Sequence, residues 1–184
     1  MPSTIPASGR GAAMNKLDHG KNDHGLLALA LGRLQHAGFA PLVFGGWAQE
    51  LLQLAAPRPH VDIDLLLRAD SFNALDQFVL SPESCGWTEI KAKRFAHKRA
   101  FLIQSVMVEL TLVEPSLVTH FWGDVPFYWL DPLPHSQAIE IDGVSASAVS
   151  AANLLRYQRL HRTTEPWRWR EQRTRSRVLP PISS

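Results

Sequence analysis

The chain has 184 residues, of which 45% are hydrophobic and 20% charged, and its formal net charge is +2. This length suits one well-cored domain with short tails, and the composition is typical of a soluble globular protein. No apolar run reaches the roughly 18 residues of a membrane span, and the first 21 residues lack the apolar core of a secretory signal. We therefore expect a cytoplasmic protein, and the single cysteine, Cys85, fits a reducing compartment.

The charges are unevenly distributed along the chain. Residues 156–177 contain eight arginines against Glu165 and Glu171, whereas residues 1–155 contain eleven lysines and arginines against fifteen acidic residues. Two interpretations stay open. A polyanionic substrate bridges the acidic and basic parts, or the basic end is a solvated tail.

The first part of the chain alternates helices with short strands. Gly38 is a plausible C-cap for the first helix, prolines close the second, and Ser71 is a good N-cap for the third. The expected elements are a helix over residues 26–36, a strand over 42–44, a helix over about 47–55, a strand over 61–67 and a helix over about 71–79.

The second part is richer in strands. Asp142-Gly143 is a hairpin turn signal, and residues 115–135, which contain four prolines, are expected to be a loop. The expected elements are strands over 88–93, 100–104, 107–113, 138–141 and 144–149, and a helix over about 151–162 capped by Ser150.

This order predicts an α+β (mixed α/β) fold, a small mixed β-sheet flanked by helices. We expect a disordered N-terminal extension over residues 1–22, one domain over 23–165 and a basic tail over 166–184.

Two carboxylates share one strand in the most informative stretch of the sequence. Asp62 and Asp64 are two residues apart, so their side chains point to the same face of the strand. The upstream turn Gly45-Gly46 lets backbone N–H groups approach a phosphate without a Cβ clash. Paired carboxylates can hold Mg²⁺ ions that bridge triphosphate oxygens, so the combination points to a metal-dependent phosphoryl or nucleotidyl transferase.

Glu109 is the best candidate for a third acid. It lies in the middle of an otherwise apolar strand, where a carboxylate is costly without a partner or a cleft. It could be a third metal ligand or the base that takes a proton from an attacking hydroxyl. Glu114, at the end of the same strand, is the second choice.

The ordered set of these residues resembles a known family. Gly45-Gly46-Trp47-Ala48, the acid Glu50, and then Arg58, His60, Asp62 and Asp64 are similar to the nucleotidyltransferases that adenylylate aminoglycosides and lincosamides, members of the DNA polymerase β-like superfamily. The resemblance is dense over residues 42–67 and consistent in order from Glu109 to about Arg162.

The resemblance implies a minimal nucleotidyltransferase fold and a role for each matching residue. Gly45 and Gly46 would contact the triphosphate of ATP or another NTP, and Asp62 and Asp64 would bind Mg²⁺. Glu109 would be ligand or general base. Glu50, Arg58 and His60 would help to form the nucleotide-binding site. The acceptor would be a hydroxyl of a small molecule, such as an aminoglycoside or a lincosamide.

Other functions stay open. The late helix carries Gln158 where members of this group often carry lysine, which keeps a non-catalytic nucleotide-binding module as an alternative. A toxin or defence nucleotidyltransferase acting on protein or RNA is another. Trp167-Arg-Trp-Arg170 resembles a short nucleic-acid patch, but no further motif supports nucleic acid as a partner. The sequence does not indicate the oligomeric state.

Overall fold

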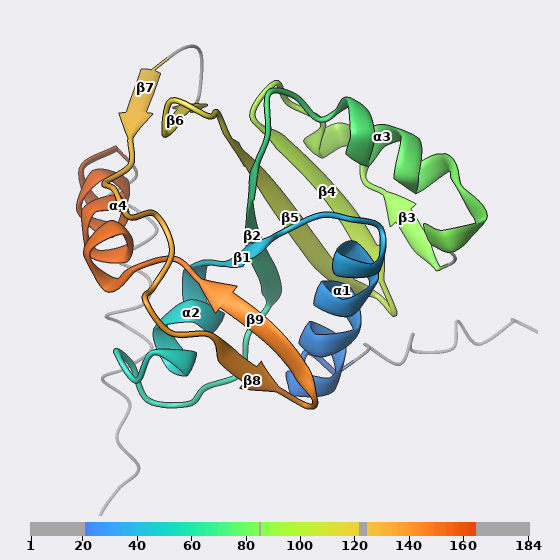
Figure 1. The fold of residues 1–184 in the computed structure, drawn as a ribbon, viewed down its shortest axis with the longest axis horizontal. Helices are drawn as coiled ribbons and strands as arrows, with labels where there is room; N and C mark the ends of the chain where they lie inside the picture. Colours follow the sequence, from blue (N-terminus) through green and yellow to red (C-terminus); the bar gives the residue numbers. More distant parts are fainter. Residues whose placement is uncertain (1–20, 85, 122–124, 165–184) are drawn as a thin grey trace, which may run out of the picture.

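A seven-stranded mixed sheet carries the candidate residues. The computed structural model describes residues 21–84, 86–121 and 125–164. The strand order is β3-β4-β5-β2-β1-β9-β8 (Figure 1). Its members are β1 (Leu42–Val43), β2 (Asp62–Arg68), β3 (Trp87–Glu89), β4 (Lys98–Ile103), β5 (Val106–Val113), β8 (Ile139–Ile141) and β9 (Val144–Ala148). The β2–β5 and β1–β9 pairs are parallel and the other pairs antiparallel, which confirms the predicted mixed sheet.

Four α-helices accompany this sheet in the described part of the chain. They are α1 (His24–His36), α2 (Gly45–Leu51), α3 (Asn73–Leu80) and α4 (Ala151–Thr164). Helix α1 begins where the Asp23 carboxylate accepts a hydrogen bond from the Leu26 N–H (3.1 Å), and it buries an apolar stripe that includes Leu27, Leu31 and Leu34. Helices α1 and α3 lie on the same side of the sheet (Figure 1).

The hydrophobic core spans the sheet and its helices. Ile63, Leu65 and Leu66 of β2 and Leu110 of β5 are fully buried. Strand β2 is central, so both of its faces are covered beyond Asp64, which leaves the acids at its N-terminal end. None of the helices in the described ranges is long and apolar enough to cross a membrane.

Several predicted boundaries are wrong. Helix α2 begins at Gly45 and ends at Leu51, because Gln53 adopts a left-handed backbone conformation (φ 56°). Helix α3 begins at Asn73, after Phe72. The strand expected over 88–93 is replaced beyond Glu89 by a 3₁₀ turn, η2 (Lys91–Lys93), which follows an earlier one, η1 (Pro82–Ser84).

Residues 115–135 are not only a loop. They contain β6 (Val118–Phe121) and β7 (Val125–Tyr128), which form a separate antiparallel pair. Both strands of a two-stranded sheet are edges, so Pro126, opposite His120, is tolerated there. The buried side chains Val118, Phe121 and Phe127 attach this pair to the core.

Some predictions fall outside the described residues. These are most of the predicted N-terminal extension, the predicted C-terminal tail with its Trp-Arg patch, and Cys85. Asn22, the last residue of the predicted extension, is described and makes hydrogen bonds of the folded domain.

Candidate nucleotide and metal site

The structure brings together the three acids that the sequence singled out. Asp62 and Asp64 project from β2, and Glu109 projects from the adjacent parallel strand β5, where it pairs with Asp64. One carboxylate oxygen from each of the three lies within 4.8 Å of the others. Three oxygen ligands at this spacing can surround one divalent cation. Glu114 lies apart from them, 3.6 Å from His120.

The glycine turn lies directly against these acids. Phe44 donates its backbone N–H to the Asp64 carbonyl (2.9 Å), and Gly45 follows with φ +60°. A Cβ atom added at Gly45 would collide with Oδ2 of Asp64, and one at Gly46 would lie 2.7 Å from Nδ1 of His60. The turn therefore needs both glycines for packing against β2 and the segment before it.

Glu50, Arg58 and His60 form one cluster behind this turn. His60 Nε2 lies 2.8 Å from Oε2 of Glu50, which also accepts the backbone N–H of Arg58 (3.2 Å). The hydrogen bond from His60 holds the pKa of Glu50 below its usual value. The His60 side chain is only 5% exposed and lies 4.2 Å from the ring of Trp47, centroid to centroid, so it supports the turn from within. A direct nucleotide contact by His60 stays a prediction.

Asn22 ties this cluster to β2, which the sequence did not predict. Its amide Nδ2 donates to the carbonyls of His60 and Asp62 (both 3.0 Å), and its Oδ1 accepts from the indole Nε1 of Trp47 (3.1 Å). Asn22 thereby fixes the backbone on which Asp62 stands.

Lys93 and Lys98 complete the site on the other side of the acids. The Nζ of Lys93 lies 2.7 Å from Oε1 of Glu109, and the Nζ of Lys98 lies 2.5 Å from Oε2. The sequence did not single out either lysine as a site residue. A strand beginning at Lys98 would have revealed the contact, because Lys98 then shares a face with Ala100, which pairs with Glu109.

The acids and lysines form one electrostatic unit. Burial, together with the charges of Asp62 and Glu109, raises the pKa of Asp64 to about 7. Burial and the charge of Glu109 also raise the pKa of Asp62. Burial alone would raise the pKa of Glu109 too, but Lys98 and Lys93 outweigh it and hold that pKa below its usual value. Glu109 is therefore ionised, while the two aspartates repel each other.

A small cavity opens beside the glycine turn. It has a volume of about 120 Å³ and is lined by Phe44, Gly45, Gln49, Leu154, Tyr157, Gln158 and His161. Helix α4 thus brings Gln158 to the Gly45 turn.

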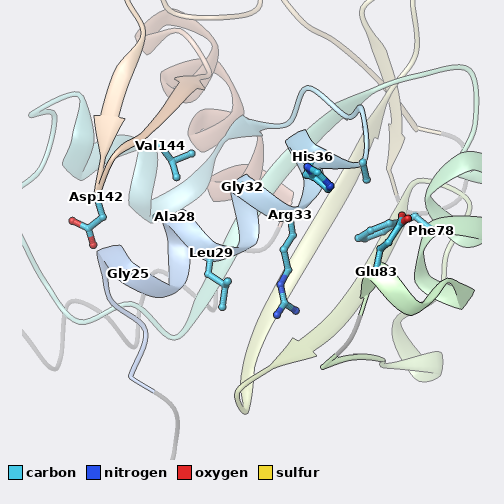
Figure 2. A pocket seen from close by; sticks show the side chains of 11 residues that line it. Gly25, Ala28, Leu29, Gly32, Arg33, His36, Phe78, Glu83, Asp142 and Val144 are labelled. Atoms are coloured by element: carbon cyan, nitrogen blue, oxygen red, sulfur yellow. The ribbon is translucent and has the colours of Figure 1, made fainter.

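A larger cavity lies elsewhere. It has a volume of about 470 Å³ and lies along α1, between α3 and the β8–β9 turn (Figure 2). None of the candidate residues lines it. The lining residues are Gly25, Ala28, Leu29, Gly32, Arg33, His36, Ala37, Phe78, Glu83, Asp142 and Val144.

Comparisons with solved structures identify the fold. The chain resembles the crystal structure of ANT(2″)-Ia in complex with adenylyl-2″-tobramycin, with a TM-score of 0.59 and 16% identity over 83% of this chain and 84% of that one. It resembles lincomycin-bound LnuA, a lincosamide antibiotic adenylyltransferase, with a TM-score of 0.59 and 13% identity over 74% and 85% of the two chains. A candidate nucleotidyltransferase of Thermotoga maritima matches with a TM-score of 0.55 and 16% identity over 86% and 98%.

These matches confirm the predicted nucleotidyltransferase-like fold. No protein-family model and no curated protein sequence matches the chain.

Proposed function

We propose that the protein is a metal-dependent nucleotidyltransferase that moves a nucleoside monophosphate from ATP or another NTP to a hydroxyl of a small molecule. One observation carries the proposal. Three carboxylates from two adjacent parallel strands meet within 4.8 Å, beside a glycine turn that packs on one of them. If Glu109 served only as the partner of a structural ion pair with the lysines, Asp62 and Asp64, which repel each other, would not be needed beside it.

The donor set fits Mg²⁺. All three side chains offer carboxylate oxygens, the ligands that this ion prefers. Burial and, after it, the neighbouring carboxylates raise the pKa values of Asp62 and Asp64, and a divalent cation would favour the ionised form of both. Asp62, Asp64 and Glu109 would hold the ion, which when bound neutralises charge on the phosphates of the substrate.

Glu109 is our candidate for the proton acceptor. The acceptor hydroxyl loses its proton to the Glu109 carboxylate, and its oxygen forms a bond to the α-phosphorus. The bond from that phosphorus to the bridging oxygen of the β-phosphate breaks, and pyrophosphate leaves with the electron pair. The two lysines keep Glu109 ionised, and by lowering its pKa they also make its carboxylate a weaker base than an ordinary glutamate.

The nucleotide would lie on the glycine side of the acids. We place the triphosphate at Gly45 and Gly46, with the exposed Arg58 close by, because a Cβ at Gly46 would stand 3.4 Å from the Arg58 guanidinium. The cavity that Gln158 lines beside Gly45 is a candidate site for another part of the nucleotide.

Structural neighbours support a small-molecule acceptor. The ANT(2″)-Ia structure contains an adenylylated aminoglycoside and the LnuA structure contains a lincosamide, so these two antibiotic classes belong in the first acceptor panel. The use of ATP and the single cysteine both suit the cytoplasm.

Calorimetry and product analysis test the proposal. Wild type should bind a non-hydrolysable ATP analogue with Mg²⁺, and it should release pyrophosphate from ATP when a suitable acceptor is present. Asp62→Asn should lose Mg²⁺-dependent binding at least tenfold, whereas Asp70→Asn, which changes an exposed carboxylate, should match wild type.

Two results would contradict the proposal. If the Asp62→Asn variant bound the ATP analogue with Mg²⁺ as tightly as wild type, Asp62 would not be part of a metal site. Binding without turnover of any acceptor would identify a nucleotide-binding module instead.

A further inference from the structure

The candidate site has two unlike sides. The glycine turn at the start of α2 packs on β2, and β5 and then β4 follow β2 in the sheet. Gly45 packs on Asp64 at one side, and Lys98 and Lys93 contact Glu109 at the other. If the triphosphate lies on the glycines, the hydroxyl that attacks must approach from the Glu109 side. The acceptor therefore meets the two lysines.

The lysines are held by the fold and are not free surface chains. Their neighbours in sequence, Arg94 and Arg99, both bind Asp76 of α3, at 2.5 Å (Nη2–Oδ2) and 2.8 Å (Nε–Oδ1). Adjacent residues of a strand point to opposite faces, so clamping Arg99 on the α3 face directs Lys98 to the acid face.

The partner strand leaves room for both ammonium groups. Ala100, the residue of β4 that pairs with Glu109, has only a methyl side chain. The Lys93 and Lys98 side chains nevertheless keep 42% and 26% of their surface exposed, against 8% for Glu109. Their ammonium groups can therefore contact Glu109 and a molecule in solution together.

Lys93 and Lys98 both contact Glu109, and their charges also act on Asp62 and Asp64. A divalent cation held by the three carboxylates would offset the acidic charge, and two partly exposed ammonium groups would then face the acceptor. A polycationic acceptor placed here would be repelled, whereas a phosphate or carboxylate group would be bound by charge-assisted hydrogen bonds.

We propose that Lys93 and Lys98 select the acceptor, and that it is a small hydroxyl compound carrying a phosphate or carboxylate group, not a polycationic amine. The inference rests on the proposed nucleotidyl transfer. It deepens that proposal by naming the charge of the substrate. The acceptor proposed for this chain therefore differs in charge from the aminoglycoside present in the ANT(2″)-Ia structure.

Matched hexoses provide the test. Glucose 6-phosphate, glucose and glucosamine share a ring and differ in charge, and tobramycin adds a polycation. Binding of each to the protein with Mg²⁺ and a non-hydrolysable ATP analogue is measured by calorimetry, and pyrophosphate release from ATP is measured separately. We expect glucose 6-phosphate to bind at least tenfold more tightly than glucose, and tobramycin and glucosamine no better than glucose.

Three variants assign the effect to the lysines. Lys98→Gln and Lys93→Gln should each weaken glucose 6-phosphate binding about tenfold more than they weaken glucose binding, the contribution of one charge-assisted hydrogen bond. Lys91→Gln, which changes an exposed lysine of the same 3₁₀ turn, should have no effect. Binding of the ATP analogue to each variant reports whether the site is still folded.

The outcomes separate the two proposals. Equal binding of the three hexoses, or a phosphate preference that survives both lysine variants, overturns the inference even if pyrophosphate release is normal. Tighter binding and faster turnover of tobramycin than of glucose 6-phosphate would also overturn the inference. If wild type shows no Mg²⁺-dependent binding of the ATP analogue, the proposed function is overturned. A preference for glucose 6-phosphate that depends on the two lysines supports the inference about acceptor binding even without turnover.

Discussion

Gly45 packs so tightly on Asp64 that no side chain fits between them. A Cβ atom at Gly45 would collide with the Asp64 carboxylate oxygen Oδ2 and lie 3.0 Å from both Cβ and Cγ of that residue. The backbone of Gly45 also has φ +60°, which disfavours other residues. The glycine turn therefore determines where one of the three acids can stand.

Gly45→Ala should displace Asp64 and weaken the metal site. We expect the free energy of unfolding to fall by about 2–4 kcal/mol, from backbone strain and from the clash, and Mg²⁺-dependent binding of an ATP analogue to fall at least tenfold. Gly38→Ala is the matched control, because Gly38 has φ +84° but no atom within 4 Å of its added Cβ. It should lose only about 1 kcal/mol and keep full binding. Equal effects of the two variants would refute the steric account.

The raised pKa of Asp64 predicts how stability depends on pH in the metal-free protein. The folded state holds a proton up to about pH 7 that the unfolded chain releases near its ordinary pKa of 3.8. Between these values the folded state binds more protons, so stability falls as the pH rises. We expect wild type to lose about 2 kcal/mol between pH 5.5 and 8 relative to Asp64→Asn. Urea denaturation at both pH values measures it. Parallel pH profiles of the two proteins would show that Asp64 titrates normally.

Residues close in sequence made part of this site predictable. Asp62 and Asp64 share a face because strand side chains alternate, and Gly45-Gly46 favours a tight turn because glycine tolerates a positive φ. Glu109 could be singled out because a carboxylate is costly in the middle of an apolar strand. Its position opposite Asp64 could not be predicted, because the register of two parallel strands is set by long-range packing.

The positive side of the site was missed for a related reason. Lys93 and Lys98 belong to a run of basic residues that has the composition of a solvated turn, and Lys93 lies in a 3₁₀ turn where a strand was expected. Their direction depends on Asp76 of α3, some twenty residues earlier in the chain. The β6–β7 pair was missed because the four prolines of residues 115–135 suggested a loop, whereas burial of Phe121 and Phe127 decides its structure.

The contact between Lys98 and Glu109 should be visible in a double-mutant cycle. Lys98→Met removes one of two ammonium groups from a buried carboxylate, so we expect it to destabilise wild type by about 1–3 kcal/mol. In the Glu109→Gln background the same change should cost less than about 0.5 kcal/mol, because no buried charge is left unpaired. Lys91→Met should be neutral in both backgrounds. Chemical denaturation measures the free energy of unfolding of wild type, the two single variants and the double variant. An equal loss of stability on Lys98→Met in the two backgrounds would mean that the ion pair contributes nothing.

Asn22 offers a test of how the acids are positioned from outside the sheet. Its amide group donates to two carbonyls around Asp62 and accepts from Trp47, so Asn22→Ala should lower the free energy of unfolding by about 2 kcal/mol. Asn22→Asp keeps the acceptor for Trp47 but loses both donated bonds and adds a charge near Asp62. We therefore expect it to reduce Mg²⁺-dependent turnover at least as strongly as Asn22→Ala does.

Lys21→Ala is the control for Asn22, because the Lys21 side chain is 87% exposed and its ion pair with Asp23 spans 3.8 Å. It should change neither stability nor turnover. If Asn22→Ala lowered stability without lowering turnover, Asn22 would support the chain near Trp47 but not the geometry of Asp62. If both fell together, and only in the Asn22 variants, the backbone before β2 would be part of what holds the three carboxylates within reach of one ion.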